Sequence, residues 1–146
     1  MKDLVLEDVY VYLLERTIRE IKRDFNRRLK ASYPDLTITS DQWVIIKRIS
    51  EREALNQREV AAVTGKDPAS ITRTLDLLVK KGWVERQAVE NDRRAYQVVL
   101  TEAGAELVQQ LTPLAKETRE AGLLGVSDQE FSNFKVTLNK IFDNVK

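Results

Sequence analysis

Residues 67–86, DPASITRTLDLLVKKGWVER, change from a helical to an extended pattern within a few positions. Asp67 is a good N-cap, and Pro68 follows at the first helical position, where its missing N–H does no harm. Apolar residues then recur at helical spacing at Ile71, Leu75, Leu78 and Val79. Gly82 ends the pattern, because glycine adopts a positive φ without strain. We therefore expect a short helix from Pro68 that leads directly into a strand.

Two stretches after this helix alternate apolar and polar residues, as half-buried strands do. They are Trp83–Arg86 and Tyr96–Leu100, and the polar stretch between them contains the turn signal Asn91-Asp92. Strands so close in sequence pair most simply as an antiparallel hairpin. The sequence therefore predicts a helix followed by a two-stranded wing.

Further helices are expected on both sides of this unit. An amphipathic helix is predicted from Asp8 to Lys30, and its apolar stripe is Leu14, Ile18, Ile21, Phe25 and Leu29. Capping patterns predict further helix starts at Thr39, Asn56, Thr101 and Ser127. The helix after Thr39 is expected to turn Trp43, Ile46 and Ile49 inward, and Pro113 is expected to kink the helix after Thr101.

The predicted fold class is mainly α with a small β-hairpin. Three compact helices followed by a wing make a winged helix-turn-helix, expected over residues 36–101 with its wing at 84–100. We expect residues 1–146 to be one domain, in which 1–34 and 102–146 are dimerisation helices. The reason is apolar surface in excess of what one small core needs. The last helix carries such a stripe at Phe131, Phe134, Leu138, Ile141 and Val145.

Composition argues against most catalytic and metal chemistry. The 146 residues include no cysteine and no histidine, so we expect no catalytic residues, no metal site and no cofactor, and we do not expect an enzyme. Lys and Arg number 24 against 23 Asp and Glu, a net charge of +1 that by itself does not favour nucleic acid. No apolar run approaches the length of a membrane span, so we expect a cytoplasmic protein with no membrane partner.

The outer face of the helix from Pro68 carries small and hydrogen-bonding residues. These are Ala69, Ser70, Thr72 and Arg73. Small residues let a helix backbone approach DNA, and an arginine can donate two hydrogen bonds to guanine, so we expect Arg73 to read a base. On an isolated helix the same pattern is more typical of a solvated face. The adjoining wing favours the DNA-binding interpretation.

The predicted hairpin has charged residues at its tip. Arg93 and Arg94 are placed where an arginine can enter the minor groove, and Asp92 can accept hydrogen bonds from Arg94 and hold that side chain extended. An ordinary charged turn would have a similar composition.

The run from Asp92 to Gly104 resembles the wing signature of the MarR family of bacterial regulators. It matches D-x-R-x-x-x-V-x-L-T-x-x-G at every fixed position, and the segment from Ser70 to Arg86 is similar to the family's recognition helix and first wing strand. The resemblance implies a homodimer that presents two winged helices to a palindromic operator in double-stranded DNA. It also implies that Gln57 lies near a phosphate, and that Arg94 and its brace Asp92 act in the minor groove.

The resemblance further implies that a small aromatic effector can bind between the dimer helices and the DNA-binding head. Candidate pocket residues are Tyr10, Phe25, Tyr33 and Trp43, although aromatic residues at helical spacing more often belong to a core. Oxidant sensing through a thiol is excluded, since cysteine is absent.

The expected function is sequence-specific transcription regulation, as a ligand-responsive repressor. A winged helix that binds protein instead of DNA is the alternative, and the acidic residues Asp76 and Glu90 are compatible with it. An enzymatic interpretation has almost no support, because the carboxylates lie among Lys and Arg at helical spacing, as on solvated faces.

Overall fold

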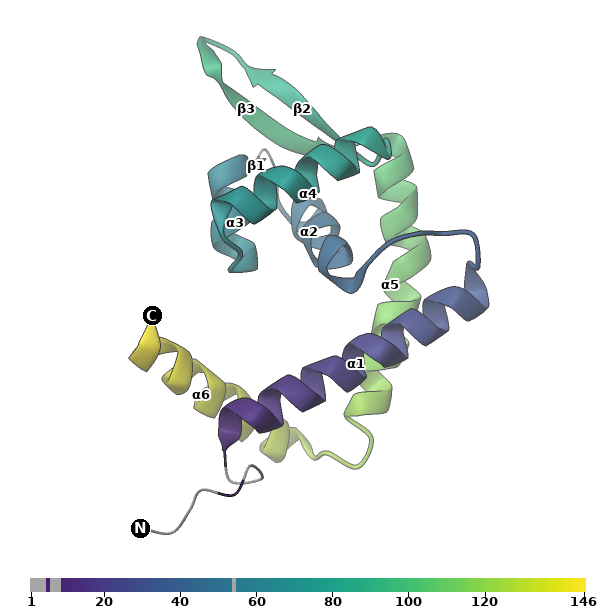
Figure 1. Ribbon diagram of the computed structural model, residues 1–146, viewed down its shortest axis with the longest axis vertical. Helices are drawn as coiled ribbons and strands as arrows, with labels where there is room; N and C mark the ends of the chain where they lie inside the picture. The colour runs from purple at the N-terminus through teal and green to yellow at the C-terminus, as the bar shows by residue number, and fades with distance from the viewer. Residues whose placement is uncertain (1–4, 6–8, 54) are drawn as a thin grey trace.

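The computed structural model describes residues 5, 9–53 and 55–146, and for residues 92–95 it describes the backbone alone. The elements follow the order α1 Tyr10–Ser32, α2 Ser40–Glu51, β1 Leu55–Asn56, α3 Gln57–Thr64, α4 Pro68–Lys80, β2 Val84–Val89, β3 Asp92–Leu100, α5 Glu102–Gly122 and α6 Asp128–Val145. The mainly helical winged helix predicted from sequence is confirmed (Figure 1). The predicted helix start at Asp8 lies outside the described residues.

The sheet contains a short strand that the sequence did not predict. Strand β1 pairs antiparallel with β3, with Leu55 opposite Val98, and β3 pairs with β2 to give the order β1-β3-β2. The hairpin of β2 and β3 projects beyond the helices at one end of the molecule, while α6 and the start of α1 lie toward the other (Figure 1).

Side-chain caps fix where α2 to α6 begin, at the residues predicted from sequence. Thr39 accepts a hydrogen bond from the Gln42 amide, Asn56 from the Glu59 amide and Ser127 from the Glu130 amide. Each cap satisfies an amide of the first turn that has no partner within its own helix. Pro113 lies inside α5, which continues to Gly122.

The core lies where α2, α4, α5 and the sheet meet. Ile46, Ile71, Leu75, Leu78 and Leu111 are completely buried there. The predicted inward residues of α2 are buried, and Val79 of α4 is partly buried against the same cluster. In α1 the apolar stripe is buried only at Phe25 and Leu29, whereas Ile18 and Ile21 are 49% and 47% exposed. No helix among the described residues is both long and apolar enough to cross a membrane.

A close contact joins α5 to the start of the wing. The Trp83 carbonyl accepts a hydrogen bond from the Thr101 amide at 3.1 Å. The Thr101 hydroxyl donates to the Gly82 carbonyl at 2.5 Å and accepts from the Gly104 amide at 3.1 Å. A Cβ at residue 104 would lie 2.0 Å from the Trp83 carbonyl oxygen. Only glycine therefore allows the first turn of α5 to reach this position.

Replacing this glycine should destabilise the fold. We expect Gly104→Ala to lower the free energy of unfolding by about 3 kcal/mol, because the obstructing atom belongs to the backbone and cannot move aside as a side chain would. Gly122→Ala is the matched control in the same helix, where a Cβ has no atom within 4 Å. Chemical denaturation of both variants at one protein concentration measures the difference, and equal stability would contradict the packing argument.

Candidate functional site

The outer face of α4 presents the residues predicted to contact DNA. Ala69 and Arg73 are exposed and Ser70 and Thr72 are half-buried, all in the first two turns of the helix. The helix crosses the molecule beneath the projecting hairpin (Figure 1). The structure therefore brings these residues together on one face, next to the wing.

The hydroxyl groups on this face are engaged in bonds within the protein. Ser70 Oγ donates to Asp67 Oδ2 at 2.5 Å, and Thr72 Oγ1 donates to the Pro68 carbonyl at 3.0 Å. A hydroxyl has a single hydrogen to donate. In this arrangement Ser70 and Thr72 can offer an outside group lone pairs and apolar surface, but no donor.

Asp67 anchors the start of α4. Its carboxylate accepts hydrogen bonds from the Ser70 hydroxyl and from the Ser70 amide, and these bonds hold the pKa of Asp67 below its ordinary value of 3.8. The nearby positive charge of Arg73 acts in the same direction. Because a lowered pKa means that the folded protein favours the charged carboxylate, this cap stays ionised in neutral solution.

Arg73 has donors to spare. Among the described residues its side-chain hydrogen bond is a long one, 3.4 Å from Nη2 to Ser70 Oγ. The guanidinium has further N–H groups that can bond a base edge or a phosphate. It is the side chain on this face best supplied to donate to DNA.

A polar network links α3, α4 and β2 beside this face. Gln57 Nε2 donates to Thr72 Oγ1 at 2.5 Å, and Arg86 Nη2 donates to Asp76 Oδ1 at 2.7 Å and lies 3.5 Å from Gln57 Oε1. Sequence reasoning placed Gln57 near a phosphate but missed its link to Thr72. It also missed Arg86 as the partner of Asp76, because nothing local relates a strand residue to a helix residue ten positions earlier.

The tip of the wing is a tight turn. Asn91 has φ of 70°, a left-handed conformation that asparagine tolerates better than most residues, and Val89 pairs with Asp92 across the turn. The side chains of Asp92, Arg93 and Arg94 lie outside the described part of the structure. The bracing of Arg94 by Asp92 therefore stays a prediction.

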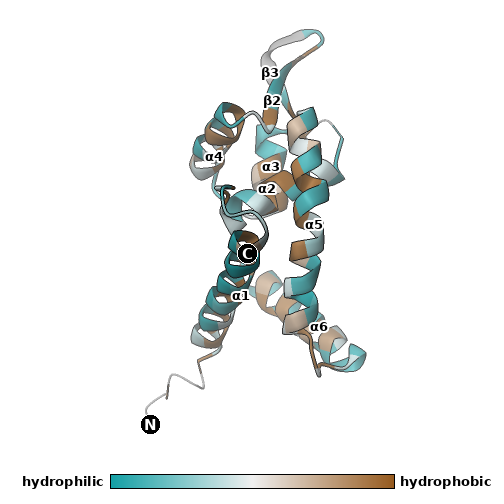
Figure 2. Ribbon diagram, turned by 90° about the vertical axis from the view of Figure 1, so that its right-hand side faces the viewer, coloured by the Kyte–Doolittle hydropathy of each residue, from teal (hydrophilic) through white to brown (hydrophobic). Residues whose placement is uncertain are grey.

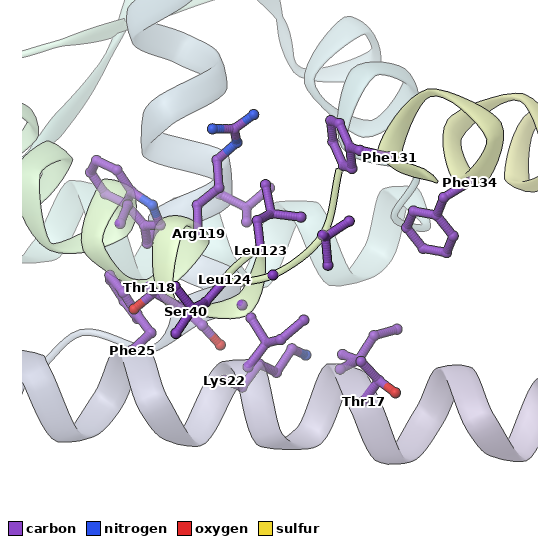
Figure 3. Close-up of a pocket in the computed structure, with 18 of the residues that line it drawn as sticks. Thr17, Lys22, Phe25, Ser40, Thr118, Arg119, Leu123, Leu124, Phe131 and Phe134 are labelled. Atoms are coloured by element: carbon purple, nitrogen blue, oxygen red, sulfur yellow. The ribbon is translucent and has the colours of Figure 1, made fainter. Parts of the chain in front are cut away.

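A large apolar cavity lies between α1, the start of α2, the end of α5 and α6 (Figure 3). Its volume is about 920 Å³. Of the predicted pocket residues, Phe25 and Trp43 line it, with ring centroids 6.4 Å apart in a stacked arrangement. Tyr33 lines a separate shallow hollow, and Tyr10 is an exposed residue that is not part of the cavity wall.

Several cavity residues come from parts of the chain that sequence reasoning did not connect with a pocket. Phe131 and Phe134 of α6 and Arg119 of α5 line this cavity and are labelled in Figure 3. The apolar stripe of α6 could have indicated these residues, because its first two members, Phe131 and Phe134, form part of the cavity wall. Thr118 also lines the cavity, but its Oγ1 is shielded from solvent and helps to lower the pKa of Asp24 on α1.

The polar rim of the cavity contains a three-part ionic contact. Asp41 Oδ1 lies 3.1 Å from Lys22 Nζ and 3.6 Å from Lys66 Nζ. Desolvation of Asp41 opposes its charge, but the hydrogen bonds and charges of Lys22 and Lys66 outweigh it and lower the pKa of Asp41. Lys22 is thereby engaged, whereas Arg119 has no carboxylate within 4.0 Å among the described residues and its guanidinium lies 5.7 Å from the Phe131 ring centroid.

Comparison with known proteins agrees with this geometry. Residues 38–96, which run from just before α2 to the middle of β3, match the model of the MarR family. The chain contains a MarR-family domain. In the sequence, the matched segment lies between α1 and α5.

Solved structures resemble the chain over nearly its full length. A mutant of MarR from E. coli complexed with operator DNA is 28% identical, with a TM-score of 0.72 and coverage of 90% of this chain and 95% of that one. A probable transcriptional regulator from Pseudomonas aeruginosa is 25% identical, with a TM-score of 0.76 and coverage of 94% and 99%. The PcaV transcriptional regulator from Streptomyces coelicolor, in complex with its natural ligand, has a TM-score of 0.87 with full coverage of both chains; at 18% identity this likeness concerns the fold.

Proposed function

We propose that this chain is a transcription regulator that binds a palindromic operator in double-stranded DNA as a homodimer and acts as a ligand-responsive repressor. The observation that carries the proposal is the outer face of α4, with Arg73 supplied to donate and a projecting hairpin beside it, within a MarR-family domain. A helix for the major groove and a wing for the adjacent backbone or minor groove are the parts that such recognition needs.

The relatives support DNA as the partner. MarR from E. coli, in mutant form, has been solved with operator DNA, and this chain resembles it over most of its length. Ala69, Ser70, Thr72 and Arg73 would face the major groove, and Arg93 and Arg94 of the wing would lie at the minor groove with Asp92 as brace. Gln57 would lie close to a phosphate, at the start of α3.

A second copy of this chain is the partner that best explains the exposed apolar helices. None of the residues of α6 is buried, and Phe134 and Phe142 are 50% and 63% exposed. Figure 2 shows hydrophobic stretches of α6 at the end of the molecule away from the hairpin. A dimer formed through α1, α5 and α6 would cover these residues and set two reading heads at a fixed spacing, which multiplies the specificity of each head.

A small aromatic acid is the effector class that the cavity suits. Phe25, Trp43 and Phe131 offer ring surfaces, and Arg119 offers a cation for a carboxylate. The PcaV regulator of the same fold has been solved with its natural ligand. Since the cavity wall includes α1, α5 and α6, a ligand there would act on the helices proposed to hold the dimer.

DNA binding by the outer face of α4 and by the wing can be measured directly. The wild-type protein should select a palindrome from a random duplex library and bind it in a salt-dependent manner. Arg73→Ala should lose about 1–3 kcal/mol of operator binding and relax specificity, and Arg94→Ala should weaken binding with folding intact. Fluorescence anisotropy over a range of salt concentrations measures both.

Arg23→Ala, checked by light scattering to remain a dimer, is the control for this experiment, because it removes an exposed arginine of α1 that is paired with Glu20. It should bind as the wild type does. An Arg94→Ala variant of unchanged affinity would exclude the assignment of the wing, and a wild-type protein that selects no DNA would exclude the proposed function.

The proposed dimer can be tested by a substitution on α6. Phe134→Glu should convert the dimer to a monomer and weaken operator binding, because it places a charge within a face proposed to be buried between copies. Asn139→Glu, at an exposed position of the same helix, should leave the dimer intact. Light scattering after size exclusion gives the mass of each species, and a dimeric Phe134→Glu protein would place the interface elsewhere.

The proposed effector class can be tested with a simple aromatic acid. Benzoate, as a simple aromatic acid, should raise the melting temperature of the protein and lower its affinity for the selected operator. Arg119→Gln should reduce the thermal shift while DNA binding remains. A thermal shift of the same size in this variant would argue against Arg119 as the carboxylate partner.

A further inference from the structure

Asp76 is out of place on a surface proposed to meet phosphates. It lies on the exposed side of α4, three residues after Arg73 and four after Thr72, and its side chain is 61% exposed. A carboxylate here repels DNA. It can also attract Arg73, because side chains three apart on a helix are neighbours and opposite charges at that spacing pair.

The structure shows Asp76 paired with a different arginine. Arg86, from β2, places Nη2 2.7 Å from Asp76 Oδ1, and its side chain is only 27% exposed. This distance is that of a charge-assisted hydrogen bond, in which Arg86 is the partly buried partner and Asp76 the exposed one. The same nitrogen lies 3.5 Å from Gln57 Oε1, so Arg86 is held between α3 and α4.

Arg73 meanwhile points toward the other end of its helix. Its hydrogen bond goes to Ser70, three residues earlier, at a length of 3.4 Å. The two arginines are thus divided between two acceptors, with Asp76 taken by Arg86 and Arg73 left in a weak contact that is easily exchanged for a base.

We propose that Arg86 is a positioning residue for DNA recognition, which occupies Asp76 and thereby keeps Arg73 available to read a base. The inference rests on the proposed function and adds the wing strand to the determinants of specificity. Without Arg86, the carboxylate of Asp76 draws the Arg73 guanidinium back along the helix and leaves an uncompensated negative charge beside the phosphates. The harmful group in that case is Asp76, so removing its charge restores recognition.

A double-mutant cycle tests this mechanism. Arg86→Met keeps the length of the side chain but neither its charge nor its hydrogen bonds. We expect it to lower the ratio of operator to non-operator affinity about tenfold, the order of a lost arginine–guanine contact. Asp76→Asn alone should change that ratio little. The double variant Arg86→Met with Asp76→Asn should regain most of it, a recovery that a merely structural role of Arg86 would not produce.

The arms of the experiment separate the possible failures. Arg23→Ala, which removes a distant arginine, controls for the loss of one positive charge, and thermal unfolding shows whether each variant is folded. If the double variant stays as weak as Arg86→Met, Arg86 contacts DNA or holds the fold itself, and the inference is overturned. An Arg86→Met protein with unchanged specificity overturns it as well. A wild-type protein that binds no DNA would instead exclude the proposed function.

Discussion

The backbone contact between Trp83 and Gly104 decides how the two halves of this molecule are joined. Four elements meet at this point: the end of α4, the start of β2, the end of β3 and the start of α5. Thr101 caps α5 and donates to Gly82 at the end of the α4 turn, so one residue fixes both connections. This junction fixes the orientation of the outer face of α4 relative to α5. Because α5 packs against α1, the junction also fixes that orientation relative to α1. A side chain at residue 104 would force these elements apart.

The wing signature therefore combines residues of two different kinds. Thr101 and Gly104 hold the junction together, whereas Arg94 is proposed to meet DNA. A similar division applies on α4, where the hydroxyls of Ser70 and Thr72 serve their own helix and Arg73 keeps its donors. Because of this internal bonding, few side chains on the outer face of α4 remain free to donate hydrogen bonds in the proposed contact with DNA. The bonding leaves the Thr72 methyl group for apolar contact and assigns hydrogen-bond donation on this face to Arg73.

What the sequence predicts well here is local, and what it misses is distant. The start of each helix from α2 to α6 depends on a cap and a residue three positions later, so it can be predicted from a short stretch of sequence. These caps are Thr39, Asn56, Asp67, Thr101 and Ser127. Strand β1 has two residues and exists only because β3 offers an edge, which no local signal reveals. The pair of Arg86 with Asp76 and the cavity between Phe25 and Phe131 require elements far apart in sequence to meet. Tyr10 and Tyr33 seemed equivalent to Phe25 and Trp43 as aromatic candidates, and only the packing of α1 against α5 separates them.

The same packing brings the cavity close to the start of the reading helix. Lys22 belongs to α1 and the cavity rim, Asp41 to the first turn of α2, and Lys66 to the turn that leads into α4. One carboxylate oxygen contacts both ammonium groups, so loss of the Lys22 contact would leave Asp41 held by Lys66 alone. Lys66 adjoins Asp67, whose carboxylate caps α4. A ligand that entered the cavity would therefore meet a chain of charges that ends at the residue on which the start of α4 depends.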